Sequence, residues 1–172
     1  MDLSLTRQSC RNFVARPVER DKLVRCVEAA RLAPSGCNSQ PWSFVIVDNP
    51  EIVPEVAKCG QALGNEFASK AGAFIVVLEE HAILMPALRR MLDSQYFAKG
   101  DLGAASICIC LEAADQGLGT CVLGLFDRET LCKLLDLPQD QRFASLIAVG
   151  YPAEETIRPK QRKPLDAMLK FV

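Results

Sequence analysis

Apolar and polar positions along the chain follow two periods. Residues 19–32 place apolar side chains every three or four positions and charged side chains between them, which predicts an amphipathic helix. The segments 44–47 and 73–78 are apolar at every position, as expected for strands buried on both faces of a sheet. Two further strands are predicted at 120–123 and 144–150.

A longer helical pattern covers residues 100–116 and is apolar almost all round. Such a helix belongs in the middle of a large core or in a subunit interface. Gly117 and Gly119 follow it and are expected to act mainly as its C-terminal cap. Shorter helices are predicted at 51–59, 61–70 and 128–135. Asp127 is placed to cap the last of these.

These segments alternate without an internal repeat or a low-complexity linker, and a chain of 172 residues has the size of one domain. We therefore expect a single domain over residues 1–172, of the α+β class, in which helices cover one central sheet. Residues 83–99 are left unassigned because Pro86 weakens any single helix there. Residues 151–172 are rich in proline and charge and are expected to form a tail.

The formal net charge of -1 argues against a protein that binds nucleic acid or an acidic membrane through a broad basic surface. A few local Arg and Lys side chains are still compatible with a small anionic ligand. No apolar stretch is long enough to span a bilayer, and the first residues lack the apolar core of a secretion signal. We therefore expect a cytoplasmic protein whose eight cysteines are reduced thiols.

Side chains suited to acid–base or metal chemistry are scarce. His81 is the only histidine, and no carboxylate pair stands in a recognisable motif. Cys108 and Cys110 are one residue apart on a predicted helix, so their side chains diverge instead of converging on a metal. We expect no metal site and no catalytic side chain, so that an enzyme of this sequence would depend on a cofactor.

Basic residues gather near both ends of the chain. Residues 7–11 supply two guanidinium groups, a hydroxyl and an amide, and Arg forks bind phosphate oxygens through paired, charge-assisted hydrogen bonds. Residues 158–163 hold four cations. Each segment alone is typical of a solvated surface turn or tail. Alternatively, the second segment closes over a phosphate that Arg7 and Arg11 already hold.

Two loops have the polar and flexible composition of a ligand site. Residues 34–42 form a longer connection than a helix and a strand need, and they carry hydroxyl and amide groups of the kind that read the edge of a heterocycle. Trp42, at the end of this loop, is expected to pack at the start of the next strand. In residues 117–126, Gly124 lets the backbone approach a planar ligand, although the glycines lack the spacing of a dinucleotide-binding fingerprint.

Together, these segments resemble the FMN-dependent nitroreductase family. The motifs are Arg-x-Ser-x-Arg-x-Phe at 7–13, Pro-Val at 17–18, Ala-Pro-Ser-Gly-x-Asn-x-Gln-Pro-Trp at 33–42, Asp-Leu-Gly at 101–103, the turn at 117–120 and Lys-x-Arg-Lys-Pro at 160–164. The resemblance covers residues 5–169. Its most specific motifs are Asn-x-Gln-Pro-Trp and the closing Lys-x-Arg.

The resemblance implies a three-layer sandwich with a mixed or antiparallel central sheet, assembled as an interlocked homodimer with two FMN molecules between the protomers. FMN would be bound non-covalently, and its N5 would carry the chemistry. NADH or NADPH would donate electrons, and small acceptors such as nitroaromatics or quinones would receive them. The sequence at 121–125 and the short chain differ from many relatives, which leaves the acceptor open. The sequence favours neither nicotinamide.

The resemblance also assigns cofactor-binding residues. Those that would meet the phosphate and the ribityl–pyrimidine edge are Arg7, Gln8, Ser9, Arg11, Lys160 and Arg162. Those that would approach the ring from the other subunit are Pro34, Ser35, Gly36, Asn38 and Gln40. Those that would otherwise lie near the ring are Asn65, which is a looser match, and Leu123 and Gly124 through their backbone.

Three alternatives stay open. The nearest is an FMN-binding protein of the same superfamily that stores or senses the cofactor, or that carries out specialised chemistry such as dehalogenation or flavin fragmentation. A thiol redox or metal-binding protein would use the eight cysteines, but no Cys-x-x-Cys pair is present. A purely structural interaction module would leave the spaced Arg, Asn, Gln and Lys residues unexplained.

Overall fold

The computed structural model describes residues 3–61, 64–87, 93 and 95–172, and within them five strands form one sheet. The strands are β1 (Phe13–Val14), β2 (Trp42–Val47), β3 (Ala73–Glu79), β4 (Gly119–Leu123) and β5 (Arg142–Pro152). Their order is β1-β5-β3-β2, with β4 also paired to β5, and all of these strand pairs are antiparallel. The expected α+β class with one central sheet is confirmed.

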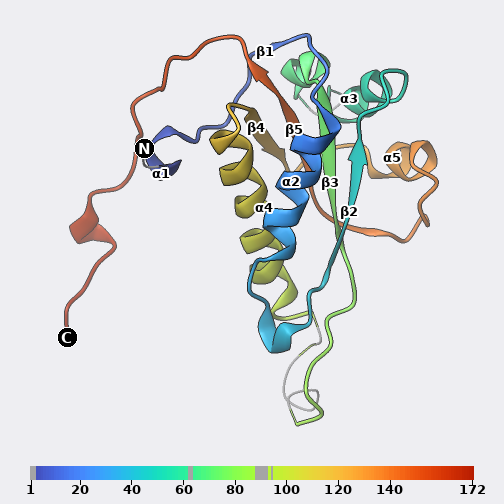
Figure 1. Ribbon diagram of the computed structural model, residues 1–172. Helices are drawn as coiled ribbons and strands as arrows, with labels where there is room; N and C mark the ends of the chain where they lie inside the picture. Colours follow the sequence, from blue (N-terminus) through green and yellow to red (C-terminus); the bar gives the residue numbers. More distant parts are fainter. Residues whose placement is uncertain (1–2, 62–63, 88–92, 94) are drawn as a thin grey trace.

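Helices cover both faces of this sheet (Figure 1). The elements are α2 (Arg20–Arg31) and α4 (Ala98–Asp115) on one face, and α3 (Val53–Gln61), the 3₁₀ segment η2 (Glu66–Lys70) and α5 (Arg128–Leu134) on the other. Side chains of β3 alternate between the two faces. Ile75 joins the apolar cluster under α2 and α4, and Val76 joins the cluster under α3 and α5. The sheet and the helices packed on each of its faces therefore form three layers.

Capping and turn residues lie at the ends of several elements where the sequence predicts them. Asp127 caps α5 through its Oδ1, which accepts a hydrogen bond from the Thr130 N–H at 3.1 Å. Gly117 has a φ of 75°, the left-handed conformation that often follows a helix C-terminus. Gly119 has a different reason to be glycine, because a Cβ there would lie 2.7 Å from the Cβ of Cys10. The N-terminal segment therefore packs directly against the start of β4.

Three predicted segments differ from the structure. The sequence predicts burial of residues 44–47 on both faces, but most of β2 is only half-buried because this strand lies at the end of the sheet order. The helix predicted at 61–70 is described only as η2, and residues 62–63 lie outside the described part of the chain. The helix predicted at 51–59 is α3, which begins and ends two residues later.

Some short elements have no predicted counterpart. These are α1 (Leu3–Thr6), β1, and the 3₁₀ segments η1 (Gly36–Asn38) and η4 (Leu165–Ala167). Of the unassigned residues 83–99, positions 88–92 and 94 lie outside the described part of the chain, and the last two residues begin α4. β1 consists of two residues, too few to show a period, and it is a strand because it pairs with the end of β5.

One face of α4 is open in the protomer. The inner face packs Leu102 and Ile109 into the core. On the outer face, Ile107 is 44% exposed, and a Cβ added at Gly100 or Gly103 would meet no atom of the described chain within 4 Å. The helix therefore has the all-round apolar character that the sequence predicts, with only one side of it covered.

After β5 the chain leaves the body as the predicted tail. From Ala153 to Val172 every residue is exposed except Lys160. Figure 1 shows the tail running past α1 and then away from the sheet. Lys160 therefore marks the outermost place where the tail is shielded by the rest of the molecule.

Candidate anion and cofactor site

The two ends of the chain run side by side in opposite directions. β1 pairs with the end of β5, and the Ala153 N–H continues the pairing by donating to the carbonyl of Asn12 at 2.9 Å. On its other side, the N-terminal segment joins β4, where the Cys10 N–H donates to the Thr120 carbonyl at 2.8 Å. Residues 7–12 are thus fixed between β4 and the tail.

A cavity of about 480 Å³ lies where these two segments meet. Its lining residues are Arg7, Gln8, Ser9, Arg11, Arg158, Pro159, Lys160, Gln161 and Arg162. Five of these nine are cations, and none is a carboxylate. Within the described residues, none of the five cations forms a salt bridge. We call this space the basic cavity, because its positive charge is uncompensated by the protein.

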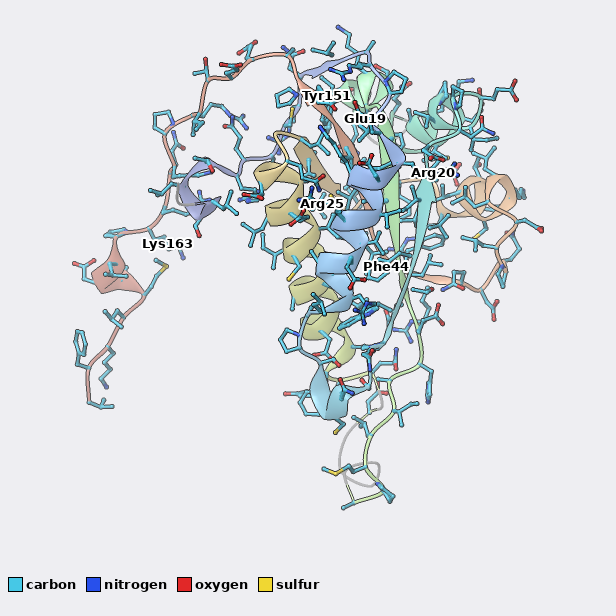
Figure 2. The ribbon with its side chains drawn as sticks, in the orientation of Figure 1. Glu19, Arg20, Arg25, Phe44, Tyr151 and Lys163 are labelled. Atoms are coloured by element: carbon cyan, nitrogen blue, oxygen red, sulfur yellow. The ribbon has the colours of Figure 1, made fainter. Side chains whose placement is uncertain are left out.

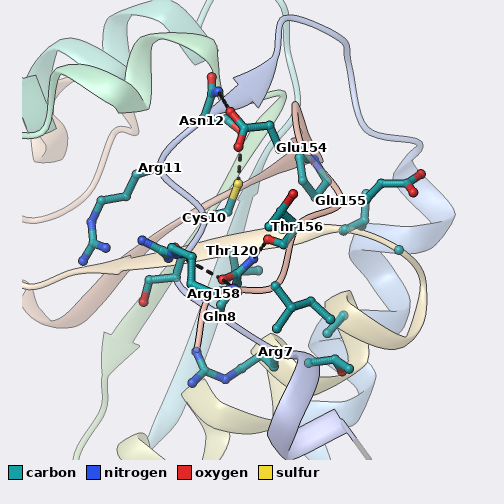
Figure 3. A pocket seen from close by; sticks show the side chains of 18 residues that line it. Arg7, Gln8, Cys10, Arg11, Asn12, Thr120, Glu154, Glu155, Thr156 and Arg158 are labelled. Atoms are coloured by element: carbon teal, nitrogen blue, oxygen red, sulfur yellow. Dashed lines mark hydrogen bonds between the residues drawn. The ribbon is translucent and has the colours of Figure 1, made fainter. Parts of the chain in front are cut away.

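A second cavity, of about 490 Å³, adjoins the basic cavity and is drawn in Figure 3. The two share residues 7–9 together with Arg11 and Arg158. The second cavity reaches the C-terminal end of α4, and Glu154 and Glu155 are among its lining residues. Its charge is therefore mixed, which leaves the basic cavity as the better place for an anion.

Lys160 lies where the tail loses solvent and where positive charges gather. Its Nζ donates a hydrogen bond to the carbonyl oxygen of Arg7. Partial loss of solvent, followed by the positive charges of Arg7, Arg162 and Arg158, lowers the pKa of Lys160. An anion in the cavity would oppose this repulsion, and a phosphate group suits a set of donors that contains several guanidinium forks.

The structure brings together the six residues that the resemblance assigns to the phosphate and the ribityl–pyrimidine edge, because all of them line the basic cavity. Arg158 lines it as well and is missing from the predicted set. The sequence signal was the run of four cations at 158–163, which does not show which members face inward. Lys163, from the same run, is exposed and lines neither cavity (Figure 2 labels it).

Gln8 and Arg158 connect the two segments directly, as Figure 3 shows. The Nε2 of Gln8 donates to the Thr156 carbonyl at 2.8 Å. Its Oε1 accepts from the backbone N–H and the Nε–H of Arg158, at 3.2 and 3.1 Å. The Nη2 of Arg158 donates to the Ser9 carbonyl at 2.6 Å. Both polar atoms of the Gln8 amide are therefore engaged by the tail.

Asn65 and Gly124 lie beyond the other end of β4, and Leu123 ends that strand. Asn65 Nδ2 donates to the carbonyls of Leu125 and Gly60, at 3.1 and 3.3 Å, so it holds the segment that follows β4. A Cβ added at Gly124 would meet nothing within 4 Å, so the backbone there is open. The β4 residue that binds the N-terminal segment is Thr120. At the rise of a strand, the distance from Thr120 to Gly124 is roughly 13 Å.

The loop at 34–40 is built from strained backbone. Cys37, Asn38 and Gln40 have φ values of 54°, 52° and 47°, in the left-handed region that side-chain-bearing residues seldom adopt. The Gly36 N–H donates to Asp101 Oδ2 at 3.1 Å, which ties the loop to the first turns of α4. Ser35 Oγ accepts from the Gln40 N–H at 3.0 Å. These two hydrogen bonds help to hold the loop in this conformation.

This loop does not meet the basic cavity within the protomer. It is fixed at Asp101, near the N-terminal end of α4, whereas the cavity pair lies beside the C-terminal end of that helix, at Gly117. At 1.5 Å per residue these two points are about 24 Å apart along the axis. Figure 1 shows η1 and α1 at opposite ends of α4. The five predicted ring contacts from this loop are thus remote from the cations.

The surroundings of the cysteine thiols and of Trp42 are those of residues with a structural role. All eight cysteines are free, and burial raises the pKa of Cys26 to about 12 and that of Cys59 to about 11, which makes both poor nucleophiles at neutral pH. Trp42 packs in the core beneath α2 and α4, as predicted.

Across the described residues, no cluster of three or more His, Cys, Asp or Glu side chains could hold a metal ion, and no helix is long and apolar enough to cross a membrane.

Comparison with known proteins places this arrangement in a family. The chain matches the model of the nitroreductase family over residues 5–151. A protein of Archaeoglobus fulgidus, provisionally named NADH dehydrogenase/NAD(P)H nitroreductase, is 32% identical over 157 residues, which span 87% of this chain and 83% of the relative. An iodotyrosine deiodinase of Haliscomenobacter hydrossis is 26% identical over 95% of this chain and 84% of its own length.

The fold is shared with solved structures as well. A protein of Exiguobacterium sibiricum, solved in complex with FMN, superimposes with a TM-score of 0.82 at 20% sequence identity, over 100% of this chain and 96% of that one. The family match covers most of the sequence, and the arrangement of helices around one antiparallel sheet agrees with it. The chain belongs to the nitroreductase family.

Proposed function

We propose that this protein is an FMN-dependent oxidoreductase that takes electrons from NADH or NADPH and passes them to small acceptors such as nitroaromatics or quinones. The observation that carries the proposal is the basic cavity, where five cations and no carboxylate meet. The nicotinamide donor is supported by the name of the Archaeoglobus relative, and FMN by the ligand of the Exiguobacterium protein.

The residues of the basic cavity fit the phosphate of FMN. A phosphate monoester carries close to two negative charges at neutral pH and offers several acceptor oxygens. Arg7, Arg11, Lys160 and Arg162 would hold it, with the Ser9 hydroxyl as a further donor. After partial loss of solvent, the positive charges of Arg7, Arg162 and Arg158 also lower the pKa of Lys160, and an anion beside them would oppose that repulsion.

When bound, FMN supplies a ring that accepts and donates hydride. The protein would contribute binding energy, orientation and donors that stabilise negative charge. Leu123 and Gly124 would offer backbone groups near the ring, and Asn65 would keep the segment after β4 in place. No side chain is assigned a proton-transfer role, and the only histidine, His81, is exposed.

The same proposal includes a homodimer. The loop at 34–40 lies too far from the cations of its own protomer to share a ligand with them, so it would serve the site of a second copy. The open face of α4 and the exposed apolar side chains of the tail, among them Leu165 and Phe171, supply surface for that contact. Analytical ultracentrifugation is expected to give a dimer at micromolar concentration, and a monomer there would contradict the arrangement.

Turnover provides the direct test of function. Purified protein incubated with FMN and freed of excess is expected to be yellow and to oxidise NADH or NADPH when menadione or nitrofurazone is present. Heat should release the yellow compound, and mass spectrometry should identify it as FMN. Protein that stays colourless after incubation with FMN would refute the proposal.

A second candidate keeps the flavin and changes the acceptor. The relative from Haliscomenobacter is named for a deiodination reaction, which favours reductive dehalogenation as the alternative. A steady-state assay with one reduced donor and a panel of quinones, nitroaromatics and iodinated phenols separates the two. Faster turnover of the iodinated phenols would favour the second candidate.

A further inference from the structure

The cofactor contacts assigned so far include no residue of the Asp-Leu-Gly motif at 101–103. The three residues lie near the start of α4 and have different surroundings. Leu102 is buried in the core, and a Cβ at Gly103 would meet no atom of the described chain within 4 Å. Asp101 is half-buried, and its Oδ2 accepts a hydrogen bond from the Gly36 N–H at 3.1 Å. The acidic member of the motif therefore contacts a residue that lies 65 positions away in the sequence.

This hydrogen bond connects the loop at 34–40 to the body of the protein. Between described residues, the loop makes one hydrogen bond to a residue distant in the sequence, and that bond goes to Asp101. Its remaining hydrogen bonds join residues within the loop, or join the loop to Trp42 directly after it. Local bonds of this kind fix the shape of a loop but not its place on the molecule. Asp101 therefore contributes to the placement of the loop.

Gly36 also lies close to the residue that precedes α4. A Cβ at Gly36 would be 3.1 Å from both the Cβ and the Cγ of Phe97, which is closer than side-chain atoms normally pack. Cys37 and Asn38 follow directly and have positive φ values. Such backbone persists only where the surrounding contacts over-determine it. The contacts of Gly36 with Phe97 and Asp101 thus hold the chain just before its strained residues.

A simpler role for Asp101 is to stabilise α4. A carboxylate in the first turn of a helix is favoured by the partial positive charge at that end. This interaction depends on charge, whereas the bond from Gly36 depends on an acceptor atom at one place. An asparagine at this position keeps an acceptor oxygen and loses the charge. The two roles therefore predict different behaviour of the variant Asp101→Asn.

We propose that Asp101 is a positioning residue, whose carboxylate places the loop at 34–40 so that its amide groups meet the flavin ring bound to a second copy of the chain. The inference rests on the proposed function for the identity of the ligand as FMN. Asp101 itself touches neither the ring nor the phosphate, and it acts through Gly36. Loss of Asp101 should therefore weaken binding of the ring and leave binding of phosphate in the basic cavity unchanged.

The test measures placement of the loop and affinity for ligands separately. Amide exchange of Gly36, followed by NMR in protein without flavin, reports placement of the loop. Fluorescence titration with riboflavin, which carries the ring without the phosphate, reports the ring side of the site. Calorimetry with inorganic phosphate reports the basic cavity.

Asp101→Ala removes the acceptor. It should speed exchange of the Gly36 N–H about tenfold to a hundredfold, because a hydrogen bond to a charged group is lost. It should weaken riboflavin and FMN by about the same factor, on the order of tenfold, and change the affinity for inorganic phosphate less than twofold. Asp101→Asn should bind riboflavin within about threefold of the wild-type affinity, because its amide oxygen still accepts from Gly36.

The matched control is Asp115→Ala, which removes an exposed carboxylate at the other end of α4 and should change each of the three affinities less than twofold. If Asp101→Ala does not fold, Asp101→Glu carries the test, because it keeps the charge and displaces the acceptor. It should still speed exchange of Gly36 and weaken riboflavin severalfold, and wild-type values for both would overturn the inference.

The outcomes separate this inference from the proposed function. If Asp101→Ala binds riboflavin and FMN as tightly as the wild-type protein, the inference is wrong while the flavin assignment stands. If the wild-type protein binds phosphate but neither flavin, the proposed function fails, and exchange of Gly36 in Asp101→Ala still decides whether Asp101 places the loop. Equal losses in Asp101→Asn and Asp101→Ala would assign Asp101 to helix stabilisation and overturn the inference. A parallel loss of phosphate affinity would overturn it as well.

Discussion

Lys160 lies among like charges at a position where the rest of the tail is fully exposed. A lysine in such surroundings holds its proton less tightly than usual, and an anion beside it reverses the effect. The proton of Lys160 and the ligand therefore favour each other's binding. This single residue gives the basic cavity a dependence on pH that its arginines do not have.

The affinity for inorganic phosphate should fall at alkaline pH in a way that depends on Lys160. The pKa of Lys160 is lowered in the free protein and rises when an anion binds, so binding takes up a proton once the pH exceeds the lowered value. As the pH rises toward 10.5, the ordinary pKa of a lysine, calorimetry should show the affinity of the wild-type protein decreasing. Lys160→Arg keeps its charge over this range and should flatten the curve.

The matched control is Lys163→Arg, which changes the neighbouring lysine outside the cavity and should leave the wild-type curve unchanged. Parallel decreases in the wild-type protein and in Lys160→Arg would remove Lys160 from the anion site.

Sequence motifs identify residues that the fold brings to one cavity where residue type and spacing carry the information. Arg7, Arg11, Lys160 and Arg162 were assigned to one phosphate, and they line one cavity. The sequence could not tell Arg158 from Lys163, because both are cations in the same run and only the antiparallel docking turns the first inward. The same docking accounts for Gln8, whose amide contacts the tail.

At the scale of elements, burial made the long helices and inner strands predictable. α2, α4, β3, β4 and β5 each carry an apolar pattern of the right period, and the structure has them within a few residues of the predicted bounds. β2 shares the pattern of an inner strand but lies at one end of the sheet order, which an apolar run alone does not reveal. The half-buried side chains of β2 follow from that position.

α4 shows why an element can be predicted while its surroundings are not. The sequence indicates apolar residues on all sides of the helix, and the structure covers only one side. Gly100 and Gly103 place no side chains on the open side, so that another helix could approach it closely. Which surface covers it depends on a second chain, and a pattern along one chain contains no such information.

For the whole molecule, the central feature is that the two ends of the chain meet while the amide-rich loop lies at the far end of α4. The first arrangement follows from β1 pairing with β5, which aligns residues 7–12 with the start of the tail. The second leaves the loop at 34–40 remote from the basic cavity of its own protomer. The proposed site, assembled from two copies, accounts for both, and it would make binding of FMN and association of the protomers interdependent.

In the proposed site, the cations of the basic cavity hold the phosphate of FMN, and comparing FMN with riboflavin tests this most directly. The two ligands differ only in the phosphate. Fluorescence titration should show that FMN binds at least a hundredfold more tightly, because about two charge-assisted hydrogen bonds of roughly 1.5 kcal/mol or more are lost without it. Arg11→Ala should weaken FMN binding about fivefold to a hundredfold and leave riboflavin nearly unaffected. Equal affinities for FMN and riboflavin in the wild-type protein would contradict the account.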